Sequence, residues 1–239
     1  KEKNVDLKEI AEKLDVETIL EGSVQKSGNR LRITVQLIRA KDNFHLWSEH
    51  FDKQTNDIFA IQDSIALNVV RRLRITLSEN EIPRISHRET TQEAYTEYLK
   101  GSYAYRQENF GQSIEYNFRA IQQDSLFAQS YSAIALAKAR IIMRAHDYGN
   151  AVAIDEAKKY ARRSIQLDPY LGEGYSALAL MAWAIEGDFS TARINFEKSI
   201  QLNPSSSLIK NRYGYFLMWM GDFNKACSLA LEAMKADPA

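Results

Sequence analysis

Residues 187–204 read GDFSTARINFEKSIQLNP, and residues 221–238 read GDFNKACSLALEAMKADP. The second stretch follows the first at a spacing of 34 residues and shares its Gly-Asp-Phe opening, one internal alanine and the closing proline. The matched pairs are Gly187 and Gly221, Asp188 and Asp222, Phe189 and Phe223, Ala192 and Ala226, and Pro204 and Pro238. A unit of this size cannot bury its apolar face alone, so copies stack into a solenoid with a concave groove. We therefore expect the function to be binding of another molecule rather than catalysis.

The period and the helix–turn–helix pattern resemble the tetratricopeptide (TPR) repeat. The resemblance implies four units, which begin near Ala94, Ala128, Gly172 and Ser207 and end near Phe127, Pro169, Pro204 and Pro238. The second unit exceeds the period by about ten residues near 141–153, which we expect to lengthen its first helix or its internal loop. The first unit ends in Asp124-Ser125, where the pattern has proline, and it is the weakest match. A proline at that place stops each second helix, because proline cannot continue a helix.

The amino-terminal third has a different period. Residues 6–14 predict a short helix, and from Thr18 apolar residues alternate with polar ones, as in a strand with one buried face. Turns are expected at 27–29 and 41–43, so strands near 18–26, 31–37 and 44–51 form an antiparallel meander. A long helix is expected from Asn56 to about Leu77, with an apolar stripe that packs on the sheet. The fold class is therefore α+β: a small α/β domain with antiparallel strands, followed by an all-α TPR solenoid.

Several blocks of this first part match a known family in order and spacing. They are residues 6–11 (DLKEIA), 19–24 (ILEGSV), 32–38 (RITVQLI), 45–49 (HLWSE) and 57–63 (DIFAIQD). They resemble the back half of the TolB amino-terminal-like domain, which frequently precedes TPR repeats in bacterial regulatory proteins. The resemblance covers about residues 5–78, and the first strand and helix of that family would lie before Lys1. The expected division is a partial TolB-like domain at 1–78, a linker at 79–91 and the solenoid at 92–239.

Composition excludes some partners and leaves others open. The 239 residues carry 31 Lys and Arg against 31 Asp and Glu, so no basic excess points to nucleic acid. No apolar run is long enough to span a bilayer, and the one cysteine, Cys227, cannot form an intramolecular disulfide. We expect the sequence to be a piece of a longer protein. Its location stays open between the extracytoplasmic part of a membrane-anchored protein and the cytoplasm.

The resemblance to TPR proteins implies that the groove is lined by one face of each first helix. Rings and arginines on such a face are the residue types that dominate binding surfaces. The predicted partner-binding residues are Tyr98, Tyr105, Arg106, Arg140, Asn211 and Tyr215. The alternative is that the tyrosine rings pack between helices, and for Trp183, Met218 and Trp219 core packing is favoured over exposure. Arg106 and Arg140 occupy equivalent places in successive units, so together they would meet an acidic partner.

The sequence contains no constellation for catalysis, and we predict no catalytic residue, metal or cofactor. His45 and His50 lie an odd number of residues apart on one expected strand, which would point them to opposite faces unless a bulge intervenes. The predicted function is a non-catalytic protein-interaction and sensory module of a larger bacterial regulator, which binds a protein or peptide through the groove and the α/β domain. An output domain, such as a cyclase, a kinase or a DNA-binding domain, would lie elsewhere in the polypeptide. The alternative is an enzyme with an unrecognised active site between the two domains.

Overall fold

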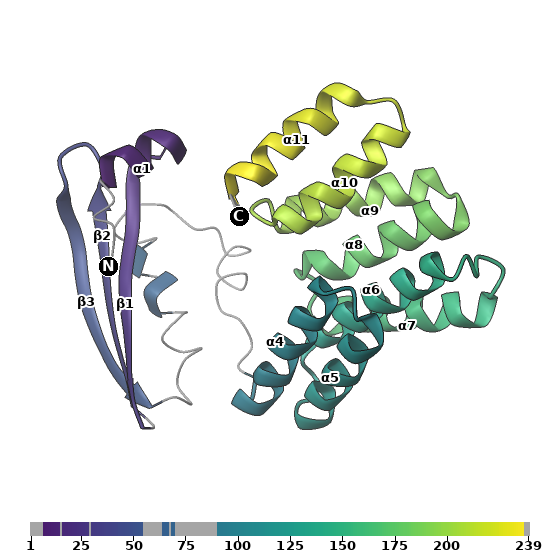
Figure 1. Ribbon diagram of the computed structural model, residues 1–239, viewed down its shortest axis with the longest axis horizontal. Helices are drawn as coiled ribbons and strands as arrows, with labels where there is room; N and C mark the ends of the chain where they lie inside the picture. Colours follow the sequence, from purple (N-terminus) through teal and green to yellow (C-terminus); the bar gives the residue numbers. More distant parts are fainter. Residues whose placement is uncertain are drawn as a thin grey trace. The chain divides into compact units, whose positions relative to one another are not determined.

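The structure, a computed structural model, describes residues 7–14, 16–28, 30–54, 64–66, 68–69 and 90–236. Contacts divide the chain into two compact units, Lys1–Glu89 and Thr90–Ala239. Every strand in the described residues belongs to the first unit, and the second unit is helical throughout (Figure 1). The α+β fold class is therefore confirmed. The predicted limits of the linker, 79–91, stay a prediction, because only residues 90 and 91 of it are described.

The first unit contains helix α1 (Leu7–Leu14) and a three-stranded antiparallel meander. Its strands are β1 (Thr18–Ser27), β2 (Arg30–Arg39) and β3 (Phe44–Gln54), in the order β1-β2-β3. Positive φ angles of 59° at Gly28 and 54° at Asn43 mark the two turns where the sequence predicts them. Such angles favour glycine and asparagine, which explains these residue types in the turns.

One face of the sheet carries the core of the first unit. It consists of Leu31, Ile33, Val35, Leu37, Trp47 and Phe51. Ile65 and Val69, from the described parts of the long helix expected at 56–77, pack against this core. The rest of that expected helix lies outside the described residues.

The second unit is a stack of four helix pairs. The pairs are α4 (Gln92–Arg106) with α5 (Phe110–Gln123), α6 (Ala128–Arg144) with α7 (Ala151–Leu167), α8 (Gly172–Met181) with α9 (Phe189–Leu202), and α10 (Ser207–Trp219) with α11 (Phe223–Ala236). The turn before each second helix explains the repeated Gly-Asp. Gly187 and Gly221 have φ angles of 71° and 79°, and the Asp188 carboxylate accepts a hydrogen bond from the Thr191 amide at 3.0 Å as an N-cap.

An Asp or Asn ends the second helix in each of the first three pairs. Asp124, Asp168 and Asn203 occupy the C-cap, and the backbone of Asp124 and of Asp168 is extended. The Asp124 carboxylate accepts a hydrogen bond from the Leu126 amide at 3.0 Å, and Asp168 accepts one from the Tyr170 amide at 2.9 Å. Helix α5 of the first pair therefore ends without proline, because the Asp124 side chain stabilises the turn.

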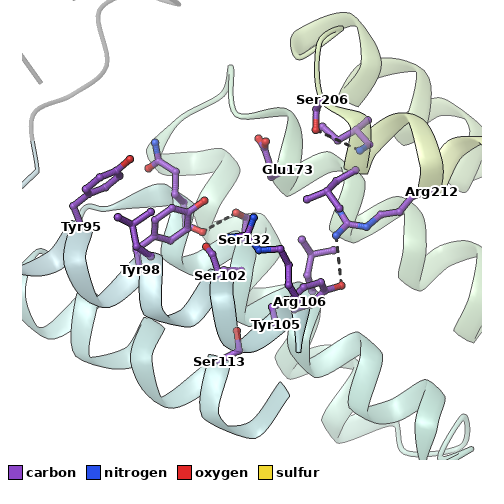
Figure 2. Close-up of a pocket in the computed structure, with 16 residues that line it drawn as sticks. Tyr95, Tyr98, Ser102, Tyr105, Arg106, Ser113, Ser132, Glu173, Ser206 and Arg212 are labelled. Atoms are coloured by element: carbon purple, nitrogen blue, oxygen red, sulfur yellow. Dashed lines mark hydrogen bonds between the residues drawn. The ribbon is translucent and has the colours of Figure 1, made fainter. Parts of the chain in front are cut away.

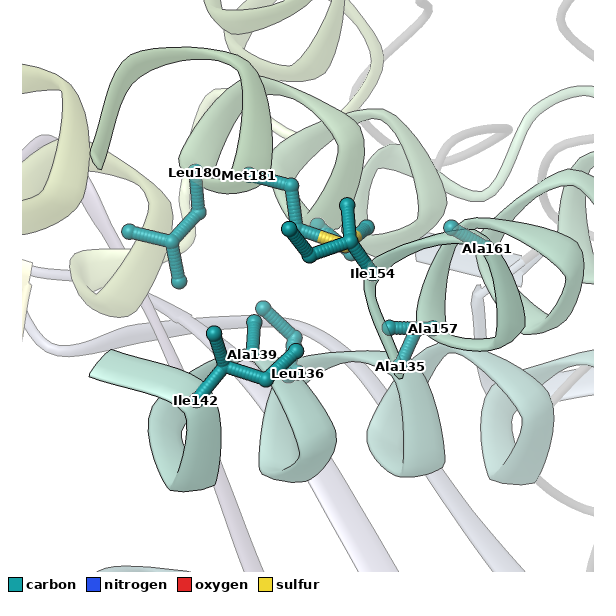
Figure 3. Close-up of a cluster of buried hydrophobic side chains, with 10 residues drawn as sticks. Ala135, Leu136, Ala139, Ile142, Ile154, Ala157, Ala161, Leu180 and Met181 are labelled. Carbon is teal, nitrogen blue, oxygen red and sulfur yellow. The ribbon is translucent and has the colours of Figure 1, made fainter. Parts of the chain in front are cut away.

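The extra residues of the second pair are distributed over three elements. Helices α6 and α7 have 17 residues each, compared with 14 in α5 and in α9, and a six-residue connection at 145–150 joins them. The sequence prediction assigned the extra length to the first helix or the loop, and it missed the longer second helix. The apolar residues of α6, α7 and α8 form one buried cluster, shown in Figure 3, in which Leu136, Ile154 and Met181 meet.

The first helix of the third pair ends in a π-helical turn, η2 (Ala182–Glu186). In this pair, 15 residues lie from the start of α8 up to the residue before Gly187, compared with 14 from the start of α10 up to the residue before Gly221. A π turn accommodates one additional residue in a helix without breaking it. This turn therefore keeps the Gly-Asp-Phe segment in place despite the longer helix.

Candidate functional site

The first helices of the four pairs together line a cavity of about 400 Å³ in the second unit (Figure 2). Helix α4 contributes a stripe of residues three and four positions apart, and α6, α8 and α10 complete the walls. The lining residues are Tyr95, Tyr98, Leu99, Ser102, Tyr105, Arg106, Ser113, Gln129, Ser132, Ala133, Leu136, Glu173, Ser206, Leu208, Ile209 and Arg212. Apolar walls with a few polar groups are typical of ligand sites, and this volume lies in their usual range.

Arg212 crosses the cavity from α10 to α4. Its guanidinium donates to the Tyr105 hydroxyl at 3.4 Å and to the Ser176 hydroxyl at 3.3 Å, and it lies 6.0 Å from the centre of the Tyr105 ring. Figure 2 shows this side chain reaching Tyr105. The contact joins the first and fourth helix pairs, which are far apart in sequence. Sequence reasoning missed Arg212, because the repeat register assigns the groove position to its neighbour Asn211.

Tyr98 forms part of the aromatic wall. Its ring lies edge-on to Phe127, with centroids 5.4 Å apart, and stacks against Tyr95 at 6.1 Å. Burial raises the pKa of the Tyr98 hydroxyl, and a hydrogen bond with Ser102 opposes that shift. The hydroxyl is therefore neutral and can both donate and accept a hydrogen bond at neutral pH.

Three of the six predicted residues line this cavity: Tyr98, Tyr105 and Arg106. Arg140 lies elsewhere, with its guanidinium 5.5 Å from the Phe110 ring centre and 3.9 Å from the Glu108 carboxylate. The structure therefore does not bring Arg106 and Arg140 together in the cavity. Asn211 is exposed outside it, and Tyr215 is 62% exposed. Whether these six residues bind a partner stays a prediction.

Helix α10 presents an exposed apolar stripe on the face that the repeat register assigned to the groove. The stripe consists of Leu208, Tyr215, Met218 and Trp219, and Trp219 is 78% exposed. The expectation of core packing was wrong for Met218 and Trp219, which lie on the solvent-facing side of α10. It was right for Trp183, which packs against the buried clusters on both sides of it.

The expected groove is filled in its middle. Ala139 of α6 and Ser176 and Leu180 of α8 are buried, although they lie on the first-helix face that the TPR resemblance assigns to the groove. Ser132 and Leu136, on the same face of α6, are also buried but line the cavity. Helices α6 and α8 pack against each other, and Ala139 and Leu180 belong to one buried cluster. The open parts of the concave face are therefore the cavity and the α10 stripe.

A bulge in the sheet changes the expected placement of the two histidines on opposite faces. The β2–β3 register shifts between Leu37 and Ile38, so His45 pairs with Ile38 and His50 with Thr34. Positions 34 and 38 lie on the same face of β2, so the two histidines share that face. No group of three potential metal ligands occurs among the described residues. An enzyme site between the two units stays a hypothesis.

No protein-family model matches the chain. A curated protein of Rhizobium meliloti (strain 1021), named putative adenylate cyclase 3, is 29% identical over 188 residues, which cover 77% of this chain and 32% of that protein. The chain therefore spans about a third of the length of this relative. In the described part of the chain, no helix has the length and apolar character needed to cross a membrane.

Solved structures identify the fold of the repeats. A thermophilic TPR protein of Thermus thermophilus has a TM-score of 0.52 and 14% identity, covering 76% of this chain and 87% of that chain. The Arabidopsis OM64 TPR domain has a TM-score of 0.42 and 14% identity, covering 53% of this chain and 96% of that domain. The first of these similarities confirms the TPR fold. The resemblance of the first unit to the TolB amino-terminal-like domain stays a prediction.

Proposed function

We propose that this chain is a non-catalytic interaction and sensing module of a longer bacterial regulatory protein. The concave face of its TPR solenoid binds a protein or peptide partner, and a TolB-like first unit contributes to that binding. The observation that carries the proposal is the exposed stripe of Leu208, Tyr215, Met218 and Trp219 on α10. Large exposed apolar side chains grouped on one helix mark interaction surfaces, and aromatic residues dominate binding energies there.

The curated relative supports the regulatory part of the proposal. It is named a putative adenylate cyclase, and the chain spans only 32% of its length. An output domain outside the present sequence, in this case a cyclase, would then receive the signal of partner binding. Nucleic-acid binding is not part of the proposal, since equal numbers of acidic and basic residues give no basic footprint. A catalytic role is not part of it either, since the sequence contains no recognised catalytic motif.

The test begins with affinity purification of a partner from bacterial extract with the wild-type chain. The purified partner is then titrated against Tyr215→Ala/Trp219→Ala and against Arg106→Ala/Arg140→Ala. Each truncated anchor should cost about 1–2 kcal/mol of binding free energy or more. Ile194→Ala is the matched control, because Ile194 is an exposed apolar residue (65%) on α9, a second helix. Unchanged affinity in both folded double variants would refute the concave face as the binding surface.

A further inference from the structure

The cavity carries a positive charge that the described residues do not neutralise. Arg106 and Arg212 both line it, and neither has a carboxylate within ion-pair distance in the described part of the chain. The one carboxylate in the lining, Glu173, accepts a hydrogen bond from the Asn203 side chain at 3.1 Å. Two guanidinium groups and one carboxylate give the cavity lining a net charge of +1, which a ligand with a single negative charge would neutralise.

Arg212 is held ready for such an anion. Its two hydrogen bonds go to the neutral hydroxyls of Tyr105 and Ser176, which fix the guanidinium plane. A guanidinium binds a carboxylate more strongly than it binds a hydroxyl, through short charge-assisted hydrogen bonds. The anion therefore gains from an arginine whose orientation is already fixed.

A buried hydroxyl in the lining also lacks a partner. Ser113 is 0% exposed, and its Oγ makes no hydrogen bond within the described residues. Because Ser113 is not exposed at all, a ligand in the cavity does not contact this hydroxyl in the present arrangement of side chains. Figure 2 places Ser113 beneath Ser102 and Tyr105.

The remaining walls favour a flat ring. The lining includes three tyrosine rings, of which Tyr95 and Tyr98 stack with an interplanar angle of 30°. Planar ligands pack well on such faces, with offset or edge-on geometry. A volume of about 400 Å³ suits a small ring inside the cavity, and the exposed stripe on α10 is left for the protein or peptide partner.

We propose that the cavity binds a small aromatic monocarboxylate. Arg212 and Arg106 hold the carboxylate, the tyrosine rings pack on the ligand ring, and the Glu173 carboxylate accepts a hydrogen bond from a hydroxyl at the far end of the ligand. The inference rests on the proposed sensing function and names a chemical class for the signal that the module detects. Because Arg212 extends from the fourth helix pair to Tyr105 of the first, an anion bound to Arg212 lies where these two pairs meet.

The test is isothermal titration of the whole chain with 4-hydroxyphenylacetate and with its neutral amide, 4-hydroxyphenylacetamide. The acid should bind at least about tenfold more tightly than the amide, because only the acid forms charge-assisted hydrogen bonds. Arg212→Gln and Arg106→Gln should each weaken binding of the acid by about tenfold or more. Arg106 is exposed and without an ion pair among the described residues, so its variant keeps the test valid if Arg212→Gln fails to fold.

Arg193→Gln is the matched control. Arg193 is half-buried like Arg212 and lies 5.7 Å from the centre of the Phe216 ring, but it does not line the cavity. Its replacement should leave the affinity for the acid unchanged. The proposal is overturned if acid and amide bind alike, if neither binds, or if Arg193→Gln weakens binding as much as Arg212→Gln.

The outcome is separable from that of the partner test. If the acid does not bind but Tyr215→Ala/Trp219→Ala still weakens partner binding, only the proposal of a small-molecule site is refuted. If the acid binds but Tyr215→Ala/Trp219→Ala leaves partner binding unchanged, only the proposal of a partner-binding surface on α10 is refuted. Binding of an acidic peptide but not of the acid would overturn the proposal in favour of a peptide site.

Discussion

Replacing Gly101 with alanine tests how closely the first helix pair is packed. A methyl group at Gly101 would run into the Asn117 side-chain amide, and it would lie 3.2 Å from the Ser113 carbonyl oxygen. Asn117 is 0% exposed, and its Nδ2 donates to that same carbonyl at 2.8 Å. The new methyl therefore displaces a buried amide from its hydrogen bond as well as overfilling the contact between α4 and α5.

The magnitude follows from three contributions. Overpacking costs roughly 1–3 kcal/mol, and a buried amide that loses its partner costs about 1–3 kcal/mol. Alanine regains about 1 kcal/mol, because it is the better helix former. The net loss in the free energy of unfolding should be roughly 1–5 kcal/mol.

Urea unfolding followed by circular dichroism measures this loss. The matched control is Gly111→Ala in α5, where a methyl group meets no atom within 4 Å. That control should be neutral or stabilising by up to about 1 kcal/mol, since only the helix preference changes. Equal stability of Gly101→Ala and Gly111→Ala would refute the proposed close packing of α4 on α5.

Three further predictions concern stability. Ala226→Phe should cost roughly 1–3 kcal/mol in urea unfolding, because Ala226 is 4% exposed where α10 and α11 pack; an unchanged midpoint would show that the repeat register is wrong. Asp188→Ala removes the N-cap of α9 and should cost about 0.5–2 kcal/mol, and Asp188→Asn should restore most of it. Burial raises the pKa of Tyr98 above its ordinary value of about 10, so the free energy of unfolding should fall as pH rises past 10, and Tyr98→Phe should flatten that fall.

The local signals in the sequence predicted most of the helical unit. Asp188 caps α9 at the start that the Gly-Asp repeat indicates, and Asp168 ends α7 just before Pro169. Ala192 and Ala226 are buried, as the repeat register requires. These features depend on residues that lie close together in the sequence, within one pair of helices. Local sequence patterns therefore reveal them.

The features that the sequence did not reveal depend on distant contacts. Arg212 reaches Tyr105 across 107 positions, and no local pattern contains that approach. The exposed positions of Met218 and Trp219 depend on what lies beside α10, which hydrophobicity alone does not specify. The register shift at Leu37 and Ile38 leaves Leu46 of β3 without a partner, so a strict two-residue period misplaced His45.

The central claim is that the concave face binds the partner. Hydrogen–deuterium exchange of the chain, with and without the purified partner, tests it most directly, because bound segments exchange more slowly. The account predicts new protection in peptides covering 95–106 and 206–219, the first helices that carry the cavity and the exposed stripe. Protection confined to the second helices α5, α7 and α9, with none at 95–106 or 206–219, would contradict it.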